Sequence, residues 1–359
     1  MSADPGRELI LAINPGATST KIAVFNGAEL LFKKTVEHSV EILKQYPSVF
    51  DQFQYRMDLV TETLIESGIV REEVKAVVGR GGLMKPVAGG TYRVNAQMID
   101  DMKKAERGEH ASNLGPVLAY NMAGRIGVPA FVVDPVSVDE MEPVARLSGH
   151  PDLPRQSFVH ALNMRAVARK VATEMGRPYQ EVNFIVAHLG TGVTVTPHKN
   201  GRMIDVSNGK DEGAFSADRC GGLPLSQLVK LCYSGRYTLQ EVQKIIFGKG
   251  GVFSYLGTRD IREVEAMAER GDEQAGIILD ALAYQAAKEI ASMAAVLEGH
   301  IDRIILTGGI AFSKRIVRAI TSRVEFLAPV IVVPGEAELE SLALGALRVL
   351  RGEEQARDY

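Results

Sequence analysis

Two stretches of the sequence follow one order of strand, glycine- and threonine-containing turn, second strand and Asn-Gly. The first is LILAINPGATSTKIAVFNG at 9–27, and the second is FIVAHLGTGVTVTPHKNG at 184–201. Each is followed later by a strand that ends in paired glycines, AVVGRGGL at 76–83 and IILTGGI at 304–310. Because a repeated order of segments is typical of internal duplication, the chain is predicted to fold as two similar halves.

Strand-like runs alternate with helical patterns along the chain, which indicates the α/β class. A length of 359 residues also suggests two domains. We place the boundary near SGHPDLP at 148–154, where Pro, Gly and Ser cluster. The predicted lobes are 1–150, joined by a returning helix in 338–359, and 151–337. Strands are expected at 8–14, 20–26, 29–35, 74–79, 130–134, 183–188, 192–197, 202–205, 303–307 and 329–333. Helices are expected at 50–68, 95–106, 113–126, 157–175, 224–233, 238–246, 260–269, 272–298, 312–321 and 339–351.

Composition excludes other classes of partner. The net charge is −3 and tryptophan is absent, so no basic or stacking surface for nucleic acid is expected. No apolar run reaches the ~18 residues of a membrane span, and the N-terminus has no pattern of a signal peptide. Cys220 and Cys232 lack metal-binding spacing. A reduced, cytoplasmic protein without membrane or nucleic-acid partners is therefore predicted.

Both glycine turns join a strand to a strand, which separates them from the common nucleotide-binding motifs. A P-loop joins a strand to a helix, and neither GxxxxGK[ST] nor GxGxxG is present. What remains is a hairpin turn whose backbone N–H groups and hydroxyls can surround a phosphate. An ordinary β-turn is the alternative for either turn alone. Two such turns on facing domains would hold one polyphosphate from both sides.

Five motifs in order, INPGATSTKIAVF, GRGG, HLGTGVTV, DEGAFSADRCGG and LTGGIA, resemble the acetate and butyrate kinase family. GEHASNLG and ADRCGGLP are similar to its butyrate kinase branch. The resemblance covers essentially the whole chain. It implies two lobes of the actin-like ATPase type, also called ribonuclease H-like, with a central cleft. It further implies reversible transfer of the ATP γ-phosphoryl group to a short-chain fatty acid, with ATP/ADP and Mg²⁺ as cofactors, and a homo-oligomer.

The implied reaction brings two anions together, so it needs cationic and hydrogen-bonding groups more than a strong base. A guanidinium beside glycines can hold a carboxylate through two hydrogen bonds. The resemblance places Arg80 on the carboxylate and Arg219 on the phosphoryl group and carboxylate. It also assigns catalytic roles to Asp134, at the end of a predicted strand, and His160, on the helix expected at 157–175.

The remaining expected contacts divide among nucleotide, acid and metal. The nucleotide-binding candidates are Asn14, Lys21, His188, Gly190, Thr191, Gly192, Gly308 and Gly309. His110 and Leu83 join Arg80 as acid-binding candidates, and Met84, Pro86 and Val87 offer apolar surface near them. Asn14 and Glu338 are the expected Mg²⁺-linked groups, although the sequence does not separate Glu338 from Glu336. Asp205 and Asn208 fit turn chemistry and are not assigned to the site.

The preferred acid stays open between butyrate, isobutyrate and propionate. An acetate or propionate kinase, or a kinase of another small acceptor on this fold, is the alternative. A sugar kinase would use an aspartate base, a role in which Asp134 could serve. A chaperone-like ATPase would need an appended peptide-binding domain, and only one predicted helix and RGEEQARDY follow residue 338.

Overall fold

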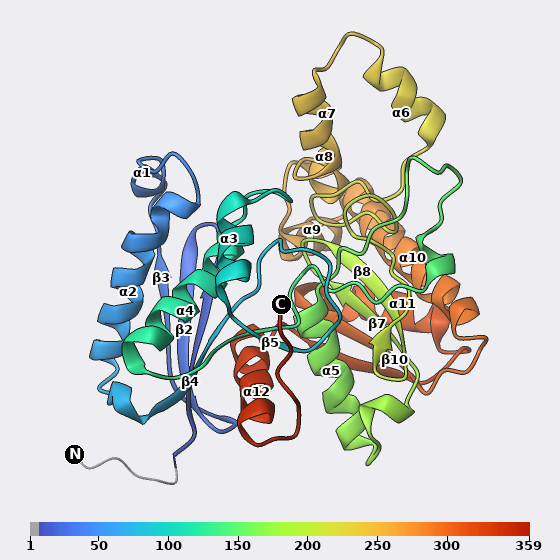
Figure 1. Cartoon of the computed structure of the whole chain (residues 1–359). Coiled ribbons are helices and arrows are strands. Elements are labelled where there is room, and N and C mark those ends of the chain that lie inside the picture. The colour runs from blue at the N-terminus through green and yellow to red at the C-terminus, as the bar shows by residue number, and fades with distance from the viewer. Residues whose placement is uncertain (1–6) are drawn as a thin grey trace. The chain divides into compact units, whose positions relative to one another are not determined.

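The computed structural model describes residues 7–359 and divides into two compact units. Unit 1 runs to Val138 and includes Ala337–Tyr359, and unit 2 is Asp139–Glu336. The division falls between Val138 and Asp139, whereas the sequence placed the boundary at 150. Each unit is a sheet with helices on its faces (Figure 1).

Among the described residues, unit 1 has a sheet of six strands in the order β3-β2-β1-β4-β6-β5. The strands are β1 (Leu9–Pro15), β2 (Ser19–Asn26), β3 (Glu29–Glu37), β4 (Val74–Gly79), β5 (Thr91–Arg93) and β6 (Ala130–Val133). β1 is antiparallel to β2 and parallel to β4, and β4 is parallel to β6. The carboxyl ends of β1, β4 and β6 therefore meet at one edge, where ligands commonly bind in α/β sheets.

Both faces of this sheet are covered by helices. Every residue of β1 is buried, as expected for a central strand. Leu9, Leu11 and Ile13 pack into the core shared with α4. The last helix, α12, returns to unit 1 and packs against β1 and β4 (Figure 1). The α-helices of unit 1 are α1 (Val40–Leu43), α2 (Phe53–Glu66), α3 (Ala96–Lys104), α4 (Leu114–Ile126) and α12 (Glu338–Leu350).

Unit 2 has a sheet of five strands in the order β11-β10-β7-β8-β9. The strands are β7 (Phe184–Leu189), β8 (Val193–Lys199), β9 (Arg202–Met203), β10 (Arg303–Gly308) and β11 (Val330–Pro334). β7 is antiparallel to β8 and parallel to β10, which is parallel to β11. In the same way, β1 of unit 1 is antiparallel to β2 and parallel to β4, which is parallel to β6. The two repeated sequence stretches therefore correspond to the same two strands and turn in each unit, which confirms two similarly folded lobes.

The helices of unit 2 enclose its sheet in the same manner. The 24-residue α10 (Glu273–Val296) buries Ile278, Leu282 and Ile290 in the core it shares with β7 and β8, and α5 also packs against β7. The other helices are α5 (Ala161–Glu174), α6 (Leu225–Cys232), α7 (Leu239–Ile246), α8 (Gly251–Leu256), α9 (Ile261–Glu269) and α11 (Lys314–Val324).

Most predicted strands and helices are present within a few residues of their predicted bounds. The sequence missed β5, which has three residues, and α1 and α8, which have four and six. The helix predicted at 157–175 begins only at Ala161, so the prediction that His160 lies on a helix is wrong. His160 is the cap residue that precedes the helix, and its φ of −81° and ψ of 55° are not helical.

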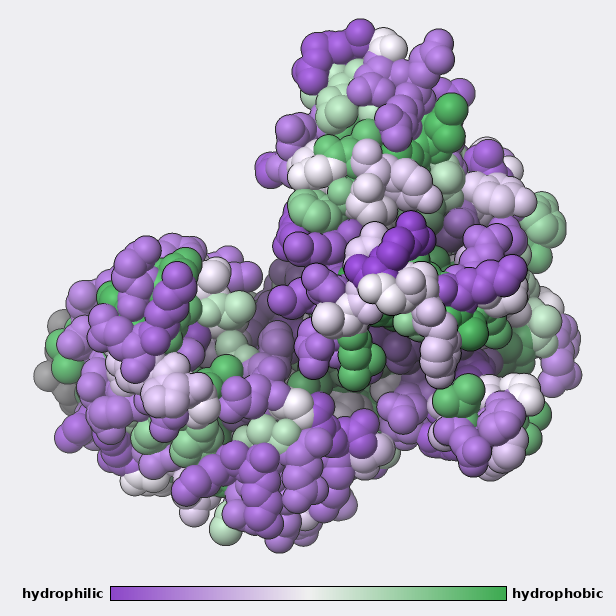
Figure 2. Space-filling model, turned by 90° about the horizontal axis from the view of Figure 1, so that it is seen from above, coloured by the Kyte–Doolittle hydropathy of each residue, from purple (hydrophilic) through white to green (hydrophobic). Residues whose placement is uncertain are grey.

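One face of the described chain is mainly hydrophilic (Figure 2). On the face drawn in Figure 2, hydrophobic residues form only separate patches. One exposed apolar row runs along α6, which buries no residue, and onto its C-cap, with Leu225, Val229 and Tyr233 exposed at four-residue spacing. Among the described residues, no helix combines the length and apolar character needed to cross a bilayer.

Candidate active site

The first glycine turn closes between β1 and β2. Strand pairing runs to Asn14 with Lys21 and Pro15 with Thr20, and the Gly16 N–H then donates to the Ser19 carbonyl at 2.7 Å. Ala17 and Thr18 are exposed at the tip. Lys21 is exposed as well, and no hydrogen bond or ion pair joins its side chain to another described residue. The turn thus presents backbone and hydroxyl groups to solvent from the end of a buried strand.

Three predicted site residues meet at the end of that strand. The Asn14 amide nitrogen donates to Glu338 Oε2 at 2.6 Å, and Arg80 Nη1 forms an ion pair with Glu338 Oε1. Asn14 lies near the end of β1, Arg80 directly follows β4, and Glu338 is the first residue of α12. A carboxylate at a helix N-terminus is also favoured by the helix dipole. The structure therefore joins an amide, a guanidinium and a carboxylate that lie far apart in sequence.

Glycines near Arg80 allow its backbone to pack directly against α4 and against the chain that follows β6. A Cβ on Gly115, at the start of α4, would lie 2.0 Å from the Arg80 carbonyl oxygen. A Cβ on Gly81 would lie 2.5 Å from Pro135, and one on Gly82 would lie 2.4 Å from Asn113 Oδ1. Only glycine fits these close approaches. The GRGG motif therefore fixes Arg80 against α4 and the chain that follows β6.

Asp134 and Leu83 lie in the segments that follow β6 and β4, and His110 lies shortly before α4. Asp134 follows β6, is 2% exposed and accepts a 2.7 Å hydrogen bond from the Gly90 N–H. Its φ of +38° is unusual for a residue with a side chain. The Leu83 N–H donates to Asn113 Oδ1 at 2.9 Å, and its side chain is half-buried. Asp134 is therefore engaged with backbone and held in a strained conformation, which is typical of functional sites.

His110 caps the turn that leads into α4, as the sequence predicted for a residue that opens a helix. Its Nδ1 accepts from the Ser112 N–H at 3.2 Å. Partial burial of the ring, followed by the nearby charge of Arg80, lowers the pKa of His110 below its usual 6.5. At neutral pH the imidazole is therefore uncharged, and a bound anion beside Arg80 would raise its pKa again.

In unit 2, two histidine rings stack beside the second glycine turn. The rings of His160 and His188 are 3.8 Å apart between centroids and inclined by 12°. His160 Nδ1 lies 3.0 Å from Thr194 Oγ1 on β8. His188, at 1% exposure, lies 3.0 Å from Asn163 through Nδ1 and 3.1 Å from Glu336 Oε1 through Nε2. The stacked pair thus sits where β7, β8 and α5 meet.

The turn after His188 is shaped by its glycines. Gly190 donates to the Gly192 carbonyl at 3.1 Å, and Thr191 is exposed between them. Gly308 at the end of β10 has a φ of +89°, and a Cβ there would lie 2.4 Å from the Leu189 carbonyl oxygen. Its neighbour Gly309 is exposed, and a Cβ there would have no described heavy atom within 4 Å. An open backbone surface therefore lies beside the end of β7.

Arg219 lies against the same turn. A Cβ on Gly192 would lie 2.1 Å from Arg219 Nη1, so the guanidinium occupies the space that glycine leaves. The guanidinium stacks over Phe247 at 4.4 Å and donates from Nη1 to the Gly209 carbonyl at 3.1 Å. Its Nε is buried and has no hydrogen-bond acceptor among the described residues. A buried donor without an acceptor is costly, and a bound anion would satisfy it.

The predicted residues therefore form two groups, one on each unit. Asn14, Arg80 and Glu338 are in direct contact on unit 1. His160 and His188 are in contact on unit 2, and Arg219 is in contact with Gly192 there. Glu336 belongs to unit 2 and Glu338 to unit 1, where Glu338 contacts Asn14 and Arg80.

Sequence reasoning missed the residues that hold the predicted ones. Asn163, Thr194 and Phe247 contact His188, His160 and Arg219. Asn163 lies three residues after His160, so the sequence spacing already indicated that these two residues lie close together. No feature of the sequence marked Phe247 as a neighbour of Arg219.

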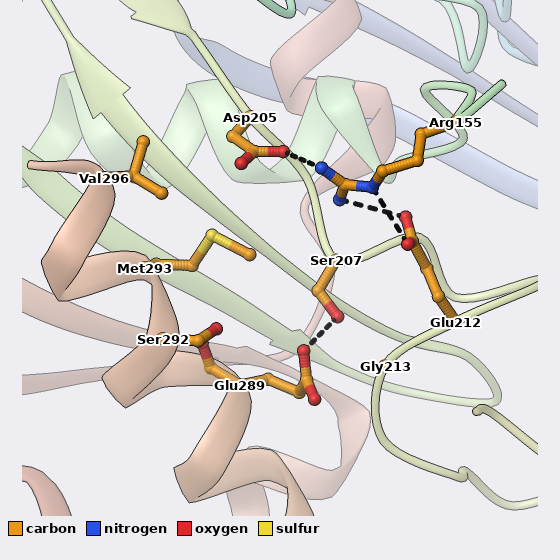
Figure 3. A pocket seen from close by; sticks show the side chains of 9 residues that line it. All are labelled: Arg155, Asp205, Ser207, Glu212, Gly213, Glu289, Ser292, Met293 and Val296. Atoms are coloured by element: carbon orange, nitrogen blue, oxygen red, sulfur yellow. Dashed lines mark hydrogen bonds and ion pairs between the residues drawn. The ribbon is translucent and has the colours of Figure 1, made fainter. Parts of the chain in front are cut away.

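A separate pocket of about 240 Å³ lies on unit 2 and contains none of the predicted site residues (Figure 3). Arg155 dominates it and pairs with Asp205 at 2.9 Å and Glu212 at 3.0 Å. Ser207 donates to Glu289 at 2.8 Å across the pocket. The charged groups thus satisfy one another. Asp205, which the sequence assigned to turn chemistry, has a structural ion pair here.

Comparison with known proteins agrees with this architecture. The Acetokinase family model matches residues 143–331. Butyrate kinase 1 of Clostridium acetobutylicum is 50% identical over 351 residues, which cover 98% of this chain and 99% of that protein. The crystal structure of Porphyromonas gingivalis acetate kinase has a TM-score of 0.76 at 19% identity, over 96% of this chain and 100% of that one. A propionate kinase from Francisella tularensis has a TM-score of 0.72 at 20% identity, over 94% and 98%.

Two α/β units with matching strand pairings, each with a glycine turn, define the fold class shared with these acetate and propionate kinase structures. The 50% sequence identity to butyrate kinase 1 over nearly the full length then shows the family of this chain. The chain belongs to the acetokinase family.

Proposed function

We propose that the protein is a carboxylate kinase that transfers the ATP γ-phosphoryl group reversibly to a short-chain fatty acid, butyrate or a branched analogue. The observation that carries this proposal is an arginine on each unit packed closely against a glycine, with Arg80 bound to a carboxylate. A carboxylate is already a nucleophile. The main barrier is repulsion between anions, which fixed guanidinium groups lower.

Unit 1 would bind the acid. Arg80 already pairs with the carboxylate of Glu338, and guanidinium geometry suits a second carboxylate through two hydrogen bonds. Neutral His110 would donate or accept a hydrogen bond beside it. The half-buried side chain of Leu83, which follows the GRGG motif, would contact the acyl chain. Asp134 would orient the acid through the backbone that it holds at Gly90.

Unit 2 would bind the nucleotide. The turn at Gly190, Thr191 and Gly192 offers backbone donors, and His188 and His160 offer imidazole donors for phosphate oxygens. The unsatisfied Nε of Arg219 would meet the transferred phosphoryl group. The open surface at Gly309, next to the closely packed Gly308, would accept the nucleoside. Asn14 and exposed Lys21, beside the first turn, would contact the terminal phosphate.

The residues present also fit Mg²⁺. This ion usually keeps several waters and takes one or two carboxylates together with substrate phosphates. Glu338 and the Asn14 side chain supply one carboxylate and one amide in contact with each other. They would hold the ion through its waters, and the bound ion would neutralise charge on the transferred phosphoryl group.

Replacing Glu338 by glutamine is expected to raise the Mg²⁺ concentration for half-maximal activity by about tenfold, because hydrogen bonds to a charged group contribute ~1.5–3 kcal/mol. Titrating Mg²⁺ at saturating ATP and acid measures the effect. Glu340→Gln, an exposed change in the same first turn of α12, is the matched control and should leave the Mg²⁺ dependence unchanged. Equal Mg²⁺ dependence in both variants would contradict the role given to Glu338.

Chain-length preference tests the choice of acid. Each buried methylene contributes ~0.8 kcal/mol, so kcat/KM for butyrate should exceed that for acetate by about 15-fold. Acyl phosphate formed from ATP and acids of two to five carbons can be trapped as hydroxamate.

Leu83→Ala should lower kcat/KM for butyrate about tenfold and that for acetate less than threefold. Leu30→Ala, at an exposed position of β3, is the control. A preference for acetate, or phosphorylation of a sugar instead, would support the alternative kinases.

We also propose a cytoplasmic homo-oligomer. Cys220 and Cys232 are free thiols, which suits a reducing compartment. The exposed apolar row Leu225, Val229 and Tyr233, along α6 and its C-cap, offers surface for a second copy.

A further inference from the structure

Arg56 on α2 lies directly behind the first glycine turn. Its side chain is fully buried, and α2 carries it beneath the junction of β1 and β2. Nη1 donates to the carbonyl oxygens of Gly16 at 3.0 Å and Ser19 at 3.3 Å, and to Thr20 Oγ1 at 3.0 Å. Nη2 lies 3.5 Å from the Ala17 carbonyl oxygen. One guanidinium therefore contacts the backbone of the whole turn.

The charge of Arg56 has no acidic partner among the described residues. Its remaining donors, Nε and Nη2, both reach Gln52 Oε1, at 3.1 and 2.9 Å. Burial lowers the pKa of Arg56, and burial followed by the Arg56 charge lowers the pKa of nearby His38 to about 4. A buried cation without a counter-ion is strongly unfavourable unless its hydrogen bonds are satisfied. A neutral side chain would fill this position at lower cost if packing alone were needed.

Peptide geometry links these contacts to the outer surface of the turn. The C=O of one residue and the N–H of the next point in opposite directions across a planar peptide. The carbonyls of Gly16 and Ala17 point toward Arg56. The N–H groups of the residues that follow them, Ala17 and Thr18, therefore point away from it. Neither N–H has an acceptor among the described residues, and both residues are exposed. A cation bound to the carbonyls also polarises the same peptides and strengthens their N–H groups as donors.

We propose that Arg56 is a positioning residue that holds the Asn14–Ser19 turn with its N–H groups of Ala17 and Thr18 directed at the terminal phosphate of ATP. The inference rests on the proposed function of this turn as a phosphate-binding loop. Arg56 itself does not contact the substrate. Lysine at this position has three donors on one nitrogen and cannot reach carbonyls on both sides of the turn and Gln52 together.

Isothermal titration of the full chain with ATP and with AMP tests the proposal. Arg56→Met is expected to weaken ATP binding about tenfold or more and Arg56→Lys about threefold, because charge-assisted hydrogen bonds to phosphate are lost. AMP lacks the terminal phosphate, so its Kd should change less than twofold. The KM for butyrate should also stay within twofold. If Arg56 had only a structural role, its replacement would lower the amount of active protein without changing the Kd for ATP more than the Kd for AMP.

Val60→Ala is the matched control. Val60 is a fully buried residue one turn further along α2, where it packs into the hydrophobic core of unit 1. It should lower the melting temperature while leaving Kd values for ATP and AMP unchanged. If Arg56→Met does not fold, Arg56→Lys decides the question. Equal changes for ATP and AMP, or an ATP Kd within twofold of wild type in the folded variants, would overturn the inference. Wild type that binds ATP but forms no acyl phosphate would contradict only the proposed reaction.

Discussion

Replacing Arg219 by alanine is expected to lower kcat about 100- to 1000-fold, the loss found when one fixed donor to a developing charge is removed. The guanidinium is held by Phe247 and the Gly209 carbonyl, and its buried Nε has no acceptor among the described residues. It is thus oriented in advance for an anion. Steady-state kinetics with ATP and butyrate measures the loss.

Arg236→Ala is the control for Arg219→Ala. Arg236 is exposed in the segment between α6 and α7, so its removal should leave kcat within twofold. Near-normal turnover of the Arg219→Ala variant would show that the phosphoryl group is stabilised elsewhere.

Gly192→Ala is expected to reproduce most of that loss without touching the arginine. A methyl group at this position would lie 2.1 Å from Arg219 Nη1, closer than side-chain atoms pack, so the guanidinium must leave its place. A decrease in kcat of about 100-fold should result, since small misplacements of a catalytic group have effects of that size. The double variant Gly192→Ala/Arg219→Ala should lose little beyond Arg219→Ala alone, because both changes remove one interaction.

Gly124→Ala provides the control for adding a methyl group. Gly124 lies in α4 with no described heavy atom within 4 Å of the new methyl position. Alanine there should leave kcat unchanged and stabilise the helix by about 0.5–1 kcal/mol. If Gly192→Ala and Arg219→Ala were fully additive in kcat, the glycine would not act through the arginine.

The strand repeat was the strongest sequence signal and predicted the fold well. Strands such as β1 and β7 are buried on both faces, so their sequences are nearly continuous apolar runs. β5 escaped prediction because three residues show no period, and its place is set by tertiary pairing with β6. His160 was placed on a helix because that helix was predicted to begin at residue 157, four residues before Ala161. No sequence signal marks the first helical residue.

Site residues next to glycines were predictable, whereas their supports were not. Arg80 directly precedes one glycine pair and Arg219 precedes another by one further residue. Close approaches of neighbouring atoms at Gly81, Gly82 and Gly221 explain those glycines. The contact of Glu338 with Arg80 joins residues that are far apart in the sequence, so only the fold reveals it. Arg56 gave no signal, because an arginine within a helical pattern usually faces solvent. Buried polar contacts of this kind depend on tertiary structure alone.

The central claim is that the ATP γ-phosphoryl group moves to a fatty acid carboxylate. Phosphorus NMR of the protein with ATP, Mg²⁺ and butyrate tests it most directly, because acyl phosphate, ADP and inorganic phosphate have separate resonances. The predicted result is an acyl phosphate signal that grows in equal amount with ADP and requires butyrate. Release of inorganic phosphate at a rate independent of butyrate, with no acyl phosphate signal, would contradict the account.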